Sequence, residues 1–65
     1  MDWRFDKWLY DEMVKRGWDI QTMAEKTGLT RVAIAYYIGG ARLPHLTSLL
    51  LILDALGMHL EIKEN

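Results

Sequence analysis

The chain has 65 residues, 51% of them hydrophobic, and no cysteine, which excludes a disulfide-stapled scaffold and a thiolate metal site. A sequence of this size forms one domain, here residues 1–65, whose small core would gain stability from a partner subunit. The acidic start MDWRFDKW lacks the form of a secretory signal, and LLLILDALGMHL is too short for a membrane span, so we expect a cytoplasmic protein.

The first predicted helix is recognised by its apolar spacing. Phe5, Leu9 and Met13 recur at every fourth residue. Four charged residues lie off this stripe: Asp6, Asp11, Glu12 and Lys15. This period is typical of an amphipathic helix and predicts one over about residues 2–16. Gly17 is a suitable residue to end it.

The second and third helices are predicted from their caps. Asp19 is a suitable N-cap for a helix over Ile20–Thr27, and Gly28 is suited to end it. Thr30 then caps a helix over Arg31–Ile38. The inward side of this third helix carries three large apolar residues: Ile34, Tyr37 and Ile38. Its outward side carries four residues: Arg31, Val32, Ala35 and Tyr36.

A fourth helix is predicted over Leu46–Leu56, with Gly57 in the left-handed position after it. Six apolar residues would form its core stripe: Leu46, Leu49, Leu50, Ile52, Leu53 and Leu56. Leu51 lies outside this stripe, so the helix is apolar on more than one face. We therefore expect a further surface to cover it.

The tail MHLEIK alternates between apolar and polar residues, which predicts a half-buried strand over about residues 58–63. No other segment of the sequence has this alternation, so the strand needs a partner from a second copy of the chain. We expect a homodimer whose interface is formed by four apolar residues: Leu51, Met58, Leu60 and Ile62.

Residues suited to catalysis or metal binding are isolated in this sequence. His45 and His59 each lack a second ligand at helical spacing, and Ser48 has no neighbouring base. Asp11 and Glu12 are interpreted as solvated carboxylates at the surface. We therefore expect no enzymatic activity, no metal, no cofactor and no small-molecule ligand.

The segment MAEKTGLTRVAI has the features of two helices joined by a tight turn. Ala24 is small enough for the helices to cross closely, Gly28 permits the turn, and Ile34 packs the second helix onto the first. Together with GGARLP and LLLILDALGM, this segment resembles the lambda-repressor and Cro-like helix-turn-helix family of transcriptional regulators over Leu9–Leu60. The expected fold is all-α, a small four-helix bundle with the helix-turn-helix in helices two and three, plus the short C-terminal β-strand.

The resemblance implies a sequence-specific regulator that binds double-stranded DNA as a homodimer on a pseudo-palindromic operator, with its third helix in the major groove. Base edges would be contacted by four residues: Arg31, Val32, Ala35 and Tyr36. Phosphates would be contacted by four others: Gln21, Thr22, Thr30 and Arg42. The net charge of −1 weighs against nucleic-acid binding, but Lys26–Ser48 holds three basic residues and no acidic one.

The sequence departs from the family pattern at several positions. Ile20 stands where a glutamine is common at the start of the second helix, and His45 replaces a frequent Ser or Thr cap. Met13 and Ile38 stand where many members pair an arginine with a glutamate, so we expect these two apolar side chains to meet in the core. The alternative function is a helix-turn-helix scaffold for protein binding, such as an antitoxin-like or assembly module, which the apolar VAIAYY favours.

Overall fold

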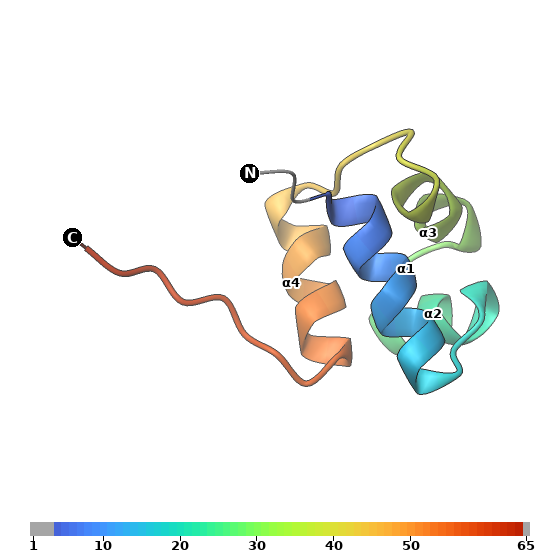
Figure 1. Cartoon of the computed structure of the whole chain (residues 1–65), viewed down its shortest axis with the longest axis horizontal. Helices are drawn as coiled ribbons and strands as arrows, with labels where there is room; N and C mark the ends of the chain where they lie inside the picture. Colours follow the sequence, from blue (N-terminus) through green and yellow to red (C-terminus); the bar gives the residue numbers. More distant parts are fainter. Residues whose placement is uncertain (1–3, 65) are drawn as a thin grey trace.

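Four helices make up the part of the chain that the computed structural model describes, residues 4–64 (Figure 1). In chain order they are α1 (Phe5–Arg16), α2 (Ile20–Thr27), α3 (Arg31–Ile38) and α4 (Leu46–Ala55). The predicted all-α bundle is confirmed, and α2 and α3 have the predicted bounds. No helix within residues 4–64 has the length and apolar character needed to cross a membrane.

The first and last helices are slightly shorter than predicted. Arg4 has extended backbone angles (φ −122°, ψ 124°), so α1 begins at Phe5. Residues 2 and 3 of the predicted helix lie outside the described residues. At the other end of the bundle, Leu56 is the cap residue of α4, and Gly57 follows it with φ 74°, in the predicted left-handed position.

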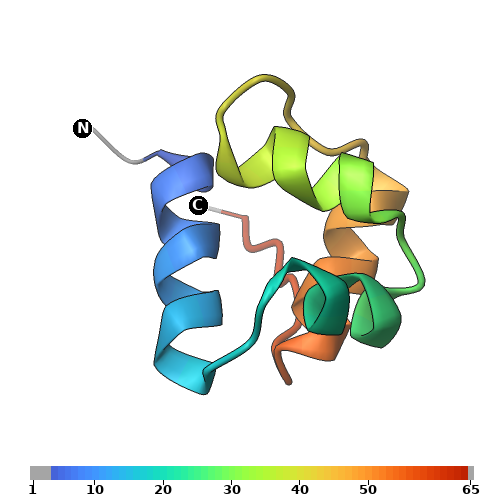
Figure 2. The ribbon, with the colours of Figure 1, turned by 90° about the vertical axis from the view of Figure 1, so that its right-hand side faces the viewer.

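The core is formed where the inward sides of all four helices meet. Leu9, Met23, Ile34 and Ile52, one from each helix, are fully buried. α3 packs against both α1 and α2, and α4 packs against α2. Figure 2 shows α1 along one side of the bundle and α3 across the end of it. Because α3 has neighbours on two helices, its orientation is fixed by the core.

Two leucines of α4 that the sequence placed in the core lie outside it. Leu46 is 62% exposed and Leu50 is 44% exposed, whereas Ile52 and Leu56 are buried as predicted. Leu51 is exposed, as expected. The prediction for Leu46 and Leu50 was wrong because a packed helix buries an apolar stripe of limited width. Within that limit, the packing of α4 against α2 selects the side that carries Ile52 and Leu56.

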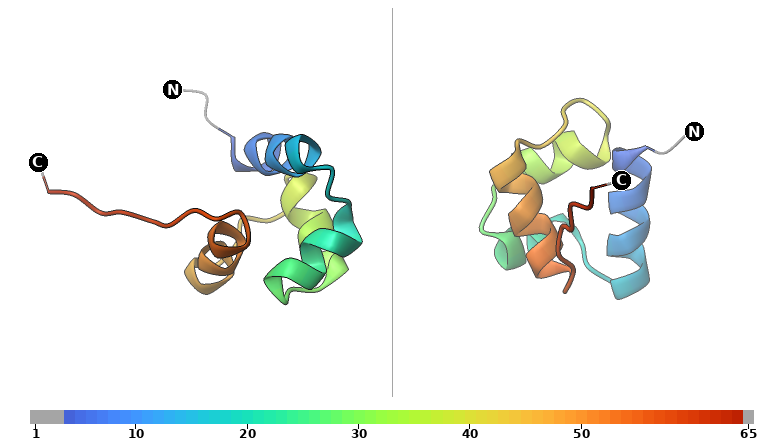
Figure 3. Two further views of the ribbon diagram at one scale, coloured as in Figure 1. Left: turned by 90° about the horizontal axis from the view of Figure 1, so that it is seen from below. Right: turned by 90° about the vertical axis from the view of Figure 1, so that its left-hand side faces the viewer.

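The predicted C-terminal strand is not found in the described residues. Residues 58–64 follow α4 without secondary structure and run away from the helices in two perpendicular views (Figure 1 and the left-hand view of Figure 3). The prediction is wrong for the single chain because a strand needs a neighbouring strand for its hydrogen bonds, and residues 4–64 contain none. The apolar side chains of Met58, Leu60 and Ile62 are consequently exposed.

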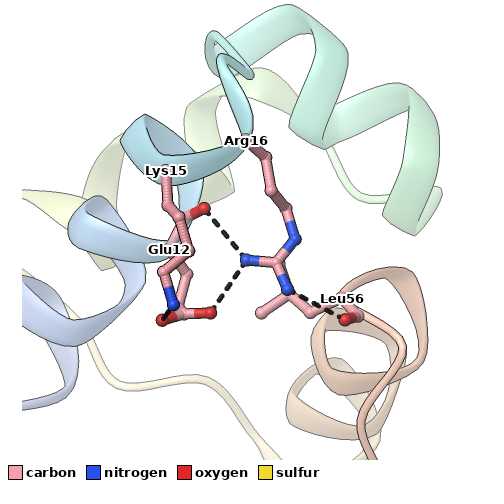
Figure 4. A network of polar contacts seen from close by, with 4 residues as sticks. All are labelled: Glu12, Lys15, Arg16 and Leu56. Atoms are coloured by element: carbon pink, nitrogen blue, oxygen red, sulfur yellow. Dashed lines mark hydrogen bonds and ion pairs between the residues drawn. The ribbon is translucent and has the colours of Figure 1, made fainter.

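A polar network joins the end of α1 to the end of α4 (Figure 4). Arg16 donates from Nη1 to the Glu12 carboxylate (2.8 Å) and from Nη2 to the Leu56 carbonyl oxygen (3.1 Å). The Lys15 ammonium lies 3.0 Å from the other carboxylate oxygen of Glu12. The hydrogen bond from Arg16, followed by that from Lys15, lowers the pKa of Glu12 below its ordinary value.

The network corrects one interpretation of the sequence. Glu12 is only 7% exposed, so it is a buried ion-pair partner and not a solvated carboxylate. The ion pairs themselves were readable from the sequence, because Lys15 and Arg16 lie three and four residues after Glu12 on one helix. The burial was not, because only the fold brings the end of α4 beside the end of α1 (Figure 4). Arg16 also stabilises α4 itself, since the last carbonyl groups of a helix lack partners within the helix.

Candidate nucleic-acid interface

The turn between α2 and α3 is held by local hydrogen bonds. Gly28 has φ 77°, a conformation that favours glycine, and its N–H donates to the Ala24 carbonyl oxygen (2.9 Å). The Thr30 hydroxyl oxygen accepts from the Ala33 N–H (3.0 Å), which caps α3 as predicted. The direction in which α3 leaves the turn is therefore determined by residues that lie close together in the sequence.

α3 has one buried and one exposed side, as the sequence predicted. Ile34 and Tyr37 are buried, and Ile38 packs against the edge of the core. The exposed side carries the four residues predicted to contact bases: Arg31, Val32, Ala35 and Tyr36. These positions form a continuous strip because residues four apart lie one above the other on a helix. Val32 is 60% exposed, so the strip presents apolar surface as well as charge.

Arg31 provides an open positive charge at the start of this strip. No ion pair joins it to another side chain among residues 4–64. Lys26 belongs to the same basic segment of the sequence, but its ammonium lies over the Trp18 ring, 4.9 Å from the ring centroid. Lys26 therefore lies against an aromatic ring, whereas Arg31 is exposed to solvent.

Arg42 lies beside the strip, although it belongs to the loop after α3. This loop, residues 39–45, leaves the end of α3 and arches toward the start of α4 (Figure 2). The Arg42 guanidinium lies over the Tyr36 ring, 4.7 Å from the ring centroid. The structure thus brings a residue predicted to contact phosphate against one predicted to contact bases. The sequence reasoning missed this contact because the path of the loop is not encoded in the spacing of the two residues.

One backbone N–H group at the start of α2 is already bound by the N-cap residue Asp19. Asp19 accepts a hydrogen bond from the Thr22 N–H (2.8 Å), and its hydrogen bonds with Thr22 lower the pKa of the Asp19 carboxyl. The Thr22 N–H is therefore used within the protein, and the Thr22 hydroxyl also interacts with Asp19, so the predicted phosphate contact requires this hydroxyl to turn away from the cap. The exposed Gln21 donates from Nε2 to the Glu25 carboxylate (3.2 Å).

An open cleft lies between α2 and the start of α3. It is lined by Gln21, Ala24, Glu25, Gly28, Leu29 and Arg31. The Gln21 amide and the Arg31 guanidinium supply hydrogen-bond donors to this cleft, and Glu25 supplies a negative charge that opposes anions there. Within residues 4–64, no three His, Cys, Asp or Glu side chains gather closely enough to hold a metal ion. The cleft can therefore bind oxygen acceptors through Arg31, and through Gln21 once its amide turns away from Glu25.

A known protein family matches most of the chain. A family model described as helix-turn-helix matches residues 9–63, a span that includes most of α1, all of the other helices and nearly all of the tail. No match was found among curated proteins or among solved structures. The matched span contains the turn after α2, the exposed strip of α3 and the loop that carries Arg42.

Proposed function

The chain belongs to the lambda-repressor and Cro-like family of helix-turn-helix proteins, and we propose that it is a transcriptional regulator that binds double-stranded DNA sequence-specifically. This family consists of DNA-binding regulatory domains and is not a family of enzymes. The observation that carries the proposal is the exposed strip of α3, which begins at an arginine without an ion pair among the described residues. A helix presented in this way fits the major groove of B-DNA.

Base recognition is assigned to the strip. Arg31 lies in the first turn of α3, the end that reaches base edges in this docking mode. Its planar guanidinium can donate to both O6 and N7 of a guanine, which no other base pair offers in the same geometry. Val32 and Ala35 provide apolar surface for a thymine methyl group, and Tyr36 lies further along the same strip.

Phosphate contacts are assigned to side chains around the strip. The Thr30 hydroxyl accepts from the Ala33 N–H and keeps its own proton to donate to a phosphate. Gln21 and Thr22 would donate from α2, for which the Gln21 amide must turn away from Glu25 and the Thr22 hydroxyl away from Asp19. Arg42 would contribute the positive charge from the loop, and such contacts position the protein without reading sequence.

A homodimer is proposed because the single chain leaves apolar surface uncovered. Leu51, Met58, Leu60 and Ile62 are all exposed. Pairing of two tails about a two-fold axis would supply the missing partner strand and cover Leu51. The two copies of α3 would then enter successive major grooves about one helical turn of DNA apart, roughly 34 Å, on a pseudo-palindromic operator.

The second candidate function is a helix-turn-helix scaffold that binds a polypeptide. It is favoured by the net charge of −1 and by the exposed Val32 on α3. Binding through phosphates releases counterions and weakens steeply as salt rises, whereas an apolar protein contact does not. Titration of the protein with mixed genomic DNA at several salt concentrations therefore separates the two functions.

The decisive experiment compares two arginine variants on a site selected from a random DNA pool. Arg31→Ala should cost about 1–3 kcal/mol on that site and relax the preference at one base pair of each half-site. Arg42→Ala should weaken binding to all DNA about equally and reduce the salt slope by about one. Lys7→Ala is the matched control, because it removes an exposed charge from α1, and it should change neither quantity.

Two outcomes would contradict the assignment. Unchanged affinity and specificity in both arginine variants would exclude α3 and its loop as the DNA-binding surface. Tight binding that survives insertion of about five base pairs between the half-sites would exclude the symmetric dimer, because the insertion turns one half-site to the opposite face of the duplex.

A further inference from the structure

We propose that Tyr36 is a positioning residue for Arg42, and that its ring holds the guanidinium against α3 in the free protein, ready to bind a DNA phosphate. This inference rests on the proposed DNA-binding function and adds a role that the exposed position of Tyr36 alone does not imply. It starts from the contact between the two side chains, in which Arg42 Cζ lies 4.7 Å from the centroid of the Tyr36 ring.

The backbone of the loop is built to bring Arg42 back over Tyr36. The Ala41 N–H donates to the Tyr36 carbonyl oxygen (2.9 Å), which closes the chain over the last turn of α3. Gly40 permits this turn, since it has φ 77° and a Cβ there would lie 2.8 Å from Oδ2 of Asp6. The residue after Ala41 is therefore placed beside the ring by backbone geometry and by the close approach of α1.

The contact with the Tyr36 ring restricts the motion of the Arg42 side chain and leaves its N–H groups available to bind DNA. A cation over an aromatic ring is attracted to the face of the ring, while the five N–H donors of a guanidinium lie in its own plane. Arg42 is exposed and forms no ion pair within residues 4–64. The nearby carboxylate of Asp6, which lines the same hollow as Arg42, is paired with Arg4. The ring thus reduces the rotamer freedom that Arg42 would otherwise lose on binding.

The two arginines of the proposed interface therefore differ in how far their side chains are held in place before DNA binds. Arg31 has no aromatic-ring contact and no ion pair among the described residues and would adapt to the base that it meets. Arg42 is held in one place relative to α3 before DNA arrives. A rigidly placed phosphate contact would fix the register of α3 on the duplex, which is the task of backbone contacts in sequence-specific binding.

The test is a double-mutant cycle on a selected DNA site, with the arginine proton shifts of the free protein measured by NMR. Arg42→Ala is introduced into the wild-type protein, into Tyr36→Leu, which lacks the ring, and into Tyr36→Phe, which keeps it. The loss of affinity caused by Arg42→Ala should be about 2- to 5-fold smaller in the Tyr36→Leu background, the range that a cation–π contact at an exposed site predicts. It should be unchanged in the Tyr36→Phe background.

The NMR measurement reports the contact without DNA. The Arg42 side-chain protons should show an upfield ring-current shift in the wild-type protein and in Tyr36→Phe, and lose it in Tyr36→Leu. Tyr10→Leu is the matched control, because Tyr10 is another exposed tyrosine, on α1, and its removal should leave both the shift and the Arg42 effect unchanged. Circular dichroism of each variant checks that it remains folded.

Each remaining outcome has a defined meaning. An equal loss of affinity on Arg42→Ala in the wild-type and Tyr36→Leu backgrounds, with DNA binding otherwise intact, would overturn the positioning role alone. Absence of the ring-current shift in the wild-type protein would also overturn it. A wild-type protein that binds no DNA from the pool would refute the proposed function, and the inference with it.

Discussion

Two substitutions on opposite sides of α3 should affect different properties: Ile34→Val should lower stability, and Val32→Ala should lower DNA affinity. Both remove aliphatic carbon from positions two residues apart on one helix. Ile34 is fully buried and belongs to the core, whereas Val32 is exposed. The pair therefore tests the orientation of α3 while the chemistry of the change stays similar.

The expected magnitudes follow from burial. Ile34→Val removes one buried methylene and should cost about 1 kcal/mol of unfolding free energy, or roughly 4–8 °C in melting temperature for so small a domain. Val32→Ala should change stability by less than about 0.5 kcal/mol, because the site is exposed and alanine favours a helix. On a selected DNA site, Val32→Ala should instead lose about 1 kcal/mol of apolar contact, roughly fivefold in affinity.

Stability is measured by urea unfolding followed by circular dichroism, and affinity by titration of labelled DNA. All proteins are compared at one concentration, since the proposed dimerisation would make apparent stability concentration-dependent. If Val32→Ala lowers the unfolding free energy as much as Ile34→Val does, then the exposed and buried sides of α3 are wrongly assigned. If Val32→Ala instead leaves both quantities unchanged, Val32 is removed from the set of base-contacting residues.

Three further predictions concern the bundle and its tail. Met13→Arg should destabilise the fold by about 3 kcal/mol through an unpaired buried charge, and adding Ile38→Glu should recover part of this; a double variant no more stable than the single one would refute the pairing. Truncation after Gly57 should yield a monomer or insoluble protein in sedimentation experiments, and an unchanged soluble dimer would exclude the tail as the interface. Because the folded pKa of Glu12 is lowered, its contribution to stability is present above the ordinary glutamate pKa and should be lost as pH falls through the lowered value. Urea midpoints against pH should therefore fall less steeply in Glu12→Gln than in the wild-type protein, and equal slopes would contradict the role of the ion pair with Arg16.

The boundaries of α2 and α3 were predictable from the sequence because the signals that set them are local. Asp19 and Thr30 each bind a backbone N–H three residues further along the chain. Gly28 supplies the left-handed conformation within a single residue. The exposed strip of α3 followed from the same kind of information, since helical periodicity alone separates Val32 from Ile34 once the helix is known. Whether the strip contacts bases stays a prediction.

The burial of α4 could not be predicted in the same way. Its leucines occupy more than one side of the helix, so periodicity does not indicate which side faces the core. Packing against α2 selects the side with Ile52 and leaves Leu46 and Leu50 exposed. The alternating tail is a related case, because the sequence pattern describes a strand but the hydrogen bonds that make one must come from another segment.

The sequence by itself determined the four helices, two of their caps and the exposed strip of α3, because these depend on residues within one or two helical turns. Only the three-dimensional structure decided that Arg42 lies on Tyr36 and that Arg16, beyond its helical neighbour Glu12, also binds the Leu56 carbonyl. Arg16 and Leu56 are 40 residues apart in the chain. The contact between Arg16 and Leu56 forms only when the core fixes the distance between the ends of α1 and α4, so no local pattern in the sequence specifies it.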